Sequence, residues 1–186
     1  ATDLATASVT LVPALVLHDT WGRLDDSSVI ASPDLAYVPQ SARNDWDLAH
    51  FEAQAGWNAS TYPAFRAGRS KRELFVREFK LAGGRVAAGT DAAQMMIVPG
   101  VSLHREMELL VEAGLPPDDA IRAATSVAAA LIGADSLGTL EAGKVADLLV
   151  LDADPRADIR NTRRILKVVL GGAVLDADSL TRRIRP

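Results

Sequence analysis

Residues 83–100 read GGRVAAGTDAAQMMIVPG. A glycine pair opens this stretch, small apolar residues follow, and the run stops at the carboxylate of Asp91. We interpret residues 85–90 as a short buried strand, because the run is apolar and the glycine pair separates it from the element before it. From the local residues alone, Asp91 is either a turn residue that hydrogen-bonds its own loop or a catalytic group at the end of a strand.

The residues on both sides of this strand predict helices. Residues 70–82 have an apolar stripe and a capping box formed by Ser70 and Glu73. A second helix is expected to begin at Ser102, and a third at PPDDA, residues 116–120, where proline and two aspartates suit the first helical turn. A strand that lies between helices favours a parallel sheet and an α/β fold class.

The stretch before residue 70 divides into two parts. Residues 9–17 are apolar and β-branched, and they read as a buried strand whose paired part ends near Val12, before Pro13. Residues 18–69 hold all three tryptophans and show no clear period, as in a lid or binding loop. These tryptophans either line a pocket for an apolar or aromatic substrate or anchor a lid.

Beyond residue 134 the pattern changes to short strands with glycine turns, and we expect no helix of useful length there. We therefore place a boundary that separates residues 1–134 from a small β unit, residues 135–186. Two parallel strands do not complete a sheet, and 186 residues do not hold an eight-stranded barrel.

Composition excludes several classes of protein. The net charge of −4 gives no reason to expect a nucleic-acid partner, and no run approaches the roughly 18 apolar residues that cross a bilayer. The absence of cysteine excludes thiol chemistry and disulfides. The first apolar segment has no basic region before it, so we do not interpret it as a secretory signal. The compartment stays open, with the cytoplasm favoured.

Three motifs in order carry a family resemblance: RVAAGTD, AATSVAA and LGTLEAGKVADLLVLDADP. Together they resemble the C-terminal part of the amidohydrolase superfamily, and among its members the imidazolonepropionase-like and prolidase-like metal-dependent hydrolases. The resemblance implies a TIM-type (β/α)8 barrel with a small β-sandwich. It makes residues 9–17 and 85–90 the last two barrel strands, with residues 18–69 as a long insertion. Residues 135–186 become the C-terminal share of the sandwich.

The resemblance also implies an activity, the hydrolysis of a C–N bond in an amide, a cyclic amide or a dipeptide. Asp91 is similar to a residue that binds the metal and shuttles a proton from the attacking water to the leaving group. The implied cofactor is a divalent metal, with zinc expected as one or two ions. His18 and His104 are candidate substrate contacts near the same end of the barrel. Alternatively, His18 is an ordinary loop residue, and His104 is exposed or satisfied by a neighbour such as Glu108 one turn later.

The number of histidines argues against a complete metal site within this chain. The chain has three histidines and no H-x-H pair, whereas a hydrolytic metal site usually has at least three protein ligands. We therefore expect the chain alone to be inactive, with the remaining ligands supplied by association with an N-terminal half, or with the chain working as a homo-oligomer. The alternatives are a catalytically inert truncated domain and an assembly or binding module that uses the tryptophan-rich stretch.

Overall fold

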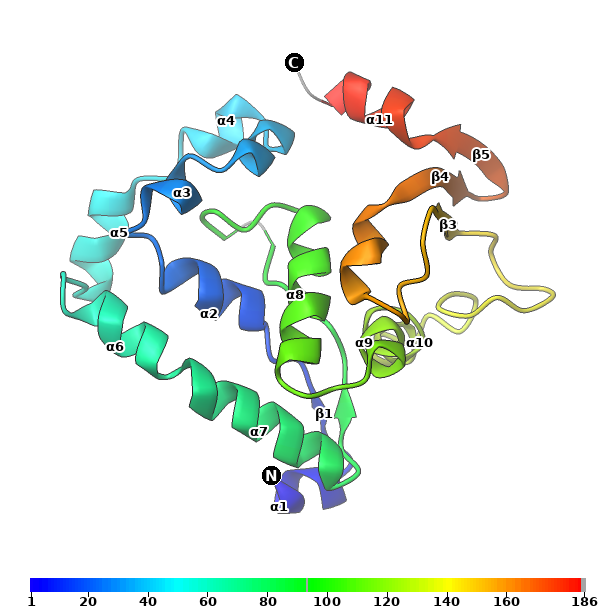
Figure 1. Cartoon of the computed structure of the whole chain (residues 1–186), viewed down its shortest axis with the longest axis horizontal. Coiled ribbons are helices and arrows are strands. Elements are labelled where there is room, and N and C mark those ends of the chain that lie inside the picture. The colour runs from blue at the N-terminus through cyan, green and yellow to red at the C-terminus, as the bar shows by residue number, and fades with distance from the viewer. Residues whose placement is uncertain (93, 185–186) are drawn as a thin grey trace.

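The computed structural model describes residues 1–92 and 94–184, with the side chain of Ile184 left aside. Two helices occupy the centre, α2 (Leu15–Trp21) and α8 (Val101–Glu112). Figure 1 shows the helices of residues 27–81 as an arc on one side of this pair, and a three-stranded sheet on the other side. A short helix, α1 (Thr2–Thr6), precedes the first strand. Within the described residues, no helix is both long and apolar enough to span a bilayer.

The two strands before and after the arc pair with each other in parallel. They are β1 (Thr10–Leu11) and β2 (Arg85–Val86), with Thr10 opposite Arg85. The predicted parallel pairing is confirmed, but both strands are shorter than predicted. The expected strand over residues 9–17 is wrong beyond Leu11, because Pro13 lacks an N–H and the chain then turns into α2.

The expected strand over residues 85–90 also ends early. The Ala87 N–H still donates to the Leu11 carbonyl at 2.9 Å, but the Ala88 N–H donates to the Ala123 carbonyl at 2.8 Å. The backbone thus leaves its partner strand for the end of the helix that contains Ala123. Hydrogen bonding to a helix terminus satisfies this buried backbone as well as a longer ladder would.

The predicted helices around β2 are present, with different first residues. Helix α7 (Arg69–Leu81) begins after Gly68, so Ser70 lies inside the helix and the predicted capping box is wrong. Helix α8 begins after Gly100, and Ser102 lies buried in its first turn instead of capping it. In both cases a glycine precedes the first helical residue, which lies before the predicted serine cap, and Gly100 has a positive φ of 78°.

The third predicted helix is two helices, α9 (Pro117–Ala124) and α10 (Ser126–Leu131). Thr125 separates them, with φ −128° and ψ −95°, and its hydroxyl donates to the Ile121 carbonyl at 2.7 Å. The Thr125 hydroxyl thus satisfies a carbonyl of the preceding turn at the point where the helix is interrupted.

Residues 18–69 are not irregular, and that prediction is wrong. They begin within α2 and continue through five short helices, each too short to show a helical period. These are α3 (Ser27–Ile30), η1 (Pro33–Tyr37), α4 (Gln40–Arg43), α5 (Leu48–Ala55) and α6 (Thr61–Ala67). The Arg66 guanidinium ties the two ends of this segment together, because it donates to the Gly22 carbonyl and to Asp25, both at 2.7 Å.

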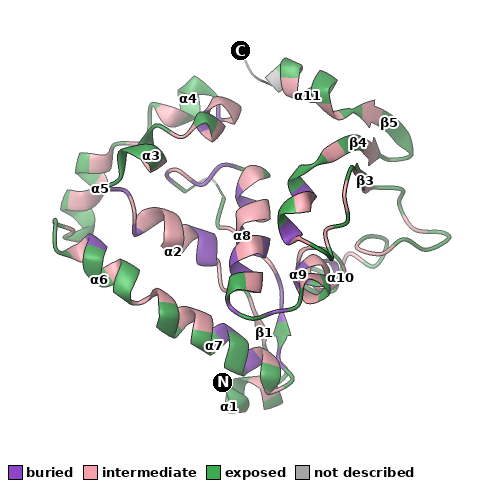
Figure 2. Ribbon diagram, viewed as in Figure 1, coloured by how far each residue is buried: buried purple, intermediate pink, exposed green. Residues whose placement is uncertain are grey.

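Figure 2 shows buried residues on α8, and Val86 of β2 and the following Ala87 are also buried. The main apolar core joins α2, α7, α8 and α9, with the fully buried Phe79, Leu110 and Ala123 at its centre. A second cluster surrounds Leu24 and Tyr62 in the arc. The apolar stripe predicted for α8 faces the main core, with Met107 and Leu110 buried. The stripe predicted for α7 is only partly right, because Phe79 is buried in the core whereas Leu74 and Phe75 are exposed.

The C-terminal segment forms an antiparallel sheet in the order β3–β4–β5. Its strands are β3 (Leu148–Leu151), β4 (Ile165–Leu170) and β5 (Ala173–Asp176). The expectation of no helix here is wrong: α11 (Ala177–Ile184) follows β5, and a 3-10 turn, η2 (Ile159–Arg163), lies before β4. Ile159 is buried in the main core, which joins this segment to α8. The division into domains at residue 134 stays a prediction.

Candidate active site

Asp91 lies five residues beyond β2, at the start of the loop that leads to α8. Its side chain is exposed, and its backbone carbonyl accepts a hydrogen bond from the Gln94 N–H at 3.2 Å. Its φ of 54° lies in the left-handed region, which residues other than glycine adopt at a cost, although aspartate tolerates it better than most. The carboxylate is therefore accessible, on a backbone that has one fixed and unusual shape.

Residues with strained backbone angles lie on both sides of β1 and in the loop after β2. Four non-glycine residues in the described part of the chain have positive φ: Ser8, Ala14, Asp91 and Met96. The first two flank β1, and the last two lie in the loop after β2. Such strain concentrates at functional sites, where the surrounding structure enforces it.

The loop after Asp91 is held by the segment that follows β1. Met95, Ile97 and Val98 are buried. The Trp21 indole N–H donates to the Met95 carbonyl at 3.0 Å, although the two residues are 74 positions apart. The aromatic segment and the loop after β2 therefore form one structural unit beside Asp91.

A cavity of about 540 Å³ lies between these two segments. Trp21 and Trp46 line it, but Trp57 does not. Trp57 packs in the aromatic cluster instead, 5.3 Å from Phe51 and 5.5 Å from Tyr62 between ring centroids. Of the two roles expected for the tryptophans, Trp21 and Trp46 line a pocket, and Trp57 anchors the segment by packing.

His18 lies on α2 and lines a smaller cavity of about 140 Å³. Its ring packs against Phe65 at 5.6 Å, and its buried Nδ1 has no hydrogen-bond partner among the described residues. Burial lowers the pKa of the imidazole, and the Arg72 guanidinium lowers it further. His18 is a helix residue with a neutral ring at pH 7, and its role as a substrate contact stays a prediction.

His104 contacts the C-terminal segment instead of its own helix. Its Nδ1 lies 3.0 Å from the Thr162 hydroxyl, which itself donates to the Ile159 carbonyl at 2.9 Å. The Thr162 oxygen therefore accepts from Nδ1–H, which fixes the tautomer of a neutral ring. Burial lowers the pKa of His104, and Arg163 adds to this while Glu108 opposes it. The hydrogen-bond partner of the ring is therefore Thr162 and not Glu108, and the role of His104 as a substrate contact stays a prediction.

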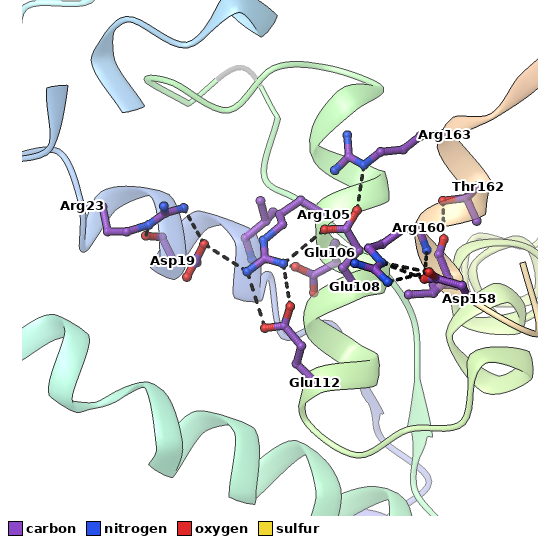
Figure 3. A network of polar contacts seen from close by, with 12 residues as sticks. Asp19, Arg23, Arg105, Glu106, Glu108, Glu112, Asp158, Arg160, Thr162 and Arg163 are labelled. Atoms are coloured by element: carbon purple, nitrogen blue, oxygen red, sulfur yellow. Dashed lines mark hydrogen bonds and ion pairs between the residues drawn. The ribbon is translucent and has the colours of Figure 1, made fainter. Parts of the chain in front are cut away.

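A network of charges joins α2, α7 and α8, and it was not predicted from the sequence. Asp19 is nearly buried and accepts from Arg23 at 2.8 Å and from Arg69 at 3.1 Å. Arg105 lies 3.7 Å from Asp19 and donates to Glu112 at 2.7 Å. Figure 3 shows Asp19 between Arg23 and Arg105, with Glu112 below Arg105. Arg69 and Arg105 are 50 and 86 residues from Asp19, so only the fold brings these pairs together.

Glu106 is a fully buried carboxyl group on α8. Its Oε2 accepts the Val16 N–H at 2.7 Å, which satisfies one of the free N–H groups at the start of α2. Burial raises the pKa of Glu106 to about 7, against the opposing N–H groups of Val16 and Leu15. The sequence indicates that Glu106 is buried, because it lies one turn from Leu103 and from Leu110 on the apolar stripe of α8.

The three residues predicted from the sequence make no direct polar contact with one another in the described part of the chain. No hydrogen bond or ion pair within residues 1–92 and 94–184 joins any two of Asp91, His18 and His104. Their common placement at one site therefore stays a prediction.

Comparison with known proteins identifies the relatives of this chain. The sequence pattern of the Amidohydrolase family matches residues 58–175, more than half of the chain. This chain belongs to the amidohydrolase family. The imidazolonepropionase of Brucella anthropi is 30% identical over 155 residues, which cover 80% of this chain and 37% of that protein. The resemblance inferred from the three motifs is confirmed.

Solved amidohydrolase structures have the same mixed α/β fold. A Xaa-Pro dipeptidase with bound methionine superposes with a TM-score of 0.65 and 22% identity, over 95% of this chain and 37% of its own. A bottromycin amidohydrolase superposes with a TM-score of 0.68 and 24% identity, over 93% of this chain and 38% of its own. The chain thus spans less than half the length of each relative that it matches.

Amidohydrolases are generally metal-dependent, so we tested whether the residues of this chain fit a metal ion. The exposed carboxylate of Asp91 suits a divalent cation as one ligand. Within the described residues, however, no three His, Asp or Glu side chains lie close enough to hold an ion together. The described residues therefore offer a single candidate ligand and do not form a complete site.

Proposed function

We propose that this chain forms the C-terminal part of a metal-dependent amidohydrolase that hydrolyses C–N bonds in amides, cyclic amides or dipeptides. In this proposal β1 and β2 are the last two strands of a TIM-type (β/α)8 barrel. The catalytic face of such a barrel is the end at which its strands finish, and Asp91 follows the last of them. The observation that carries the proposal is an exposed, strained Asp91 beyond a parallel strand in a chain of this family.

The surfaces of the strand pair are consistent with a place inside a larger barrel. In the described part of the chain, β1 pairs only with β2, so each strand has one free edge. Several apolar side chains near this pair are exposed: Val9, Val12, Leu74, Phe75 and Leu81. Free strand edges and exposed apolar residues favour association with further strands and helices, or with a second copy of the chain.

The proposed role of Asp91 follows from its chemistry. A bound divalent metal lowers the pKa of water to about 7, which makes it a nucleophile at neutral pH. The Asp91 carboxylate would be one ligand, and the other ligands would come from outside the described residues. It would also accept the proton that the attacking water loses and deliver it to the leaving nitrogen. One C–O bond forms, one C–N bond breaks, and the carboxylate ends unprotonated.

The test compares two substitutions of aspartate by asparagine. Asp91→Asn keeps the shape of the side chain but removes the proton acceptor, so hydrolysis should fall by about 100-fold or more. Asp135→Asn makes the same change in an exposed loop and should leave hydrolysis unchanged. The measurement is made on the chain combined with the N-terminal half that supplies the remaining ligands. It follows the rate of amine release from lactams, linear amides and dipeptides, with bound metal determined in parallel. An Asp91→Asn rate within about threefold of the unchanged protein would refute the role of Asp91.

A further inference from the structure

The cavity of about 540 Å³ has the size of a small-molecule site, since such sites are typically about 300–1,000 Å³. One wall is the loop after Asp91, including Gln94 and Ile97. The other wall comes from the arc, with residues of η1 and α5 and the chain between them. A ligand in this cavity would therefore contact both of the segments that Trp21 joins.

Four aromatic side chains line the cavity: Trp21, Tyr37, Trp46 and Phe51. Trp21 and Phe51 lie 4.9 Å apart between ring centroids, at an angle of 60°. The hydrogen bond from Trp21 to the Met95 carbonyl uses the polar atom of its indole, so the rest of the ring presents apolar surface. Rings that are already fixed by packing bind a flat apolar group with little loss of freedom.

The charges of the lining restrict the ligand further. Asp45 and Asp47 belong to the lining, which contains one histidine, His50, and no lysine or arginine. Asp47 is held in place because its carboxylate accepts the His50 backbone N–H at 2.9 Å and caps α5. Two carboxylates with no lysine or arginine beside them in the lining repel a carboxylate ligand and favour a neutral or positively charged one.

The cavity is connected to Asp91 through the backbone of the loop after β2. Gln94 belongs to its lining, whereas Asp91 does not, and the Gln94 backbone N–H donates to the Asp91 backbone carbonyl at 3.2 Å. The cavity therefore ends at the turn that carries Asp91.

We infer that this aromatic cavity holds the ring of an aromatic substrate that carries no negative charge, such as a neutral or cationic aryl amide. The inference rests on the proposed function, because it takes the cavity as the specificity pocket of the Asp91 site. It separates this chain from hydrolases of free dipeptides, whose substrates carry a carboxylate. Trp46 and Trp21 supply the ring contacts, and Asp45 with Asp47 supply the selection by charge.

Three probes of equal size test the inference without any hydrolysis: benzylamine, benzyl alcohol and benzoate. In ¹⁵N-tryptophan-labelled protein, the indole N–H signals of Trp21 and Trp46 should shift with benzylamine and benzyl alcohol. The signal of Trp57, which lies outside the lining, is the internal control. Benzoate should bind more weakly than either. Equal shifts of all three signals, preference for benzoate, or no shift at millimolar probe would overturn the inference.

Two variants sharpen the test. Trp46→Ala should weaken binding of benzyl alcohol by about tenfold through loss of ring contact. Asp45→Lys changes an exposed side chain, so this variant should fold, and it keeps the inference testable even where Trp46→Ala does not fold. Relative to the unchanged protein, the ratio of the affinity for benzoate to that for benzylamine should rise by about fivefold or more, which is the size of one charge pair in water. An unchanged preference would overturn the selection by charge.

Failure of this inference is distinguishable from failure of the proposed function. Asp91→Asn should abolish hydrolysis and leave probe binding intact. If the probes do not bind but Asp91→Asn still abolishes amide hydrolysis, the cavity is wrong and the function stands. If the probes bind as expected and no amide is hydrolysed, the cavity is a binding site without the proposed reaction.

Discussion

Replacing Glu106 by glutamine should change how the stability of this protein depends on pH. Glu106 is fully buried, and burial raises its pKa from 4.5 to about 7. Between these two values the carboxyl group of the folded protein is protonated, while that of the unfolded chain is ionised. The folded state therefore binds more protons, so the free energy of unfolding must fall as pH rises through this range.

The size of the effect follows from the same two pKa values. A tenfold change in a proton equilibrium is worth about 1.4 kcal/mol, so the full loss is about 3 kcal/mol. Between pH 5 and pH 8 it should be about 2–3 kcal/mol, because the unfolded group is already mostly ionised at pH 5. The Glu106→Gln side chain is uncharged and still offers an oxygen to the Val16 N–H. Its contribution should therefore not change with pH.

The assay is urea unfolding at pH 5 and pH 8 of the unchanged protein and of two variants. Glu78→Gln makes the same chemical change on the exposed surface of α7 and serves as the control. The unchanged protein and Glu78→Gln should lose similar stability between the two pH values, and Glu106→Gln should lose about 2–3 kcal/mol less. Three parallel profiles would show that Glu106 is ionised in the folded protein at pH 5, and the reasoning from burial would be refuted.

Two further predictions concern stability. Asp19→Asn should lower the free energy of unfolding by about 2–3 kcal/mol, measured in urea, because it removes the charge of a nearly buried acceptor of two hydrogen bonds. Asp25→Asn changes an exposed ion pair and should lower it by less than about 1 kcal/mol. Equal losses would contradict the importance of burial. Gly84→Ala should cost about 1–3 kcal/mol, because its Cβ would lie 2.4 Å from the Phe79 ring. Combining it with Phe79→Leu should cost less than the sum of the two single changes in thermal unfolding, and strict additivity would refute the clash.

The sequence predicted the parts of the fold that depend on local periodicity. Helices α7 and α8 have apolar stripes long enough to read, and the strand pair was expected from strands that alternate with helices. Their first residues were placed wrongly, because glycines at 68 and 100, and not the neighbouring serines, precede the helices. The position of a cap depends on backbone angles that a neighbouring good capping residue does not reveal.

The prediction failed where distant residues decide the local structure. Residues 15–17 are apolar and read as strand, yet they are helical, and their free N–H at Val16 is satisfied by Glu106, 90 residues later. The short helices of the arc are similar, since each has two turns or fewer and is held by packing between rings. Intrinsic propensity is a weak guide to segments of this length.

The candidate site was predicted in part. The position of Asp91 beyond a strand followed from the sequence, and its proposed role came from the family resemblance. Composition pointed to the tryptophans, but the choice of Trp21 and Trp46 over Trp57 as lining depends on how the arc folds back on the loop after β2. Asp19 gave no clear signal, because only Arg23 is near it in sequence, whereas Arg69 on α7 and Arg105 on α8 are brought to it by tertiary packing.

The hydrogen bond from Arg66 to the Gly22 carbonyl has a consequence for how this protein changes in evolution. It closes the segment between α2 and α7 at its base, so the chain leaves and re-enters the core at nearly the same point. A segment with joined ends can be lengthened, shortened or exchanged while the strand pair and the core helices stay as they are. If the cavity selects the ligand, a change of this segment alone can therefore change selectivity, while Asp91 and the strand before it stay unaltered.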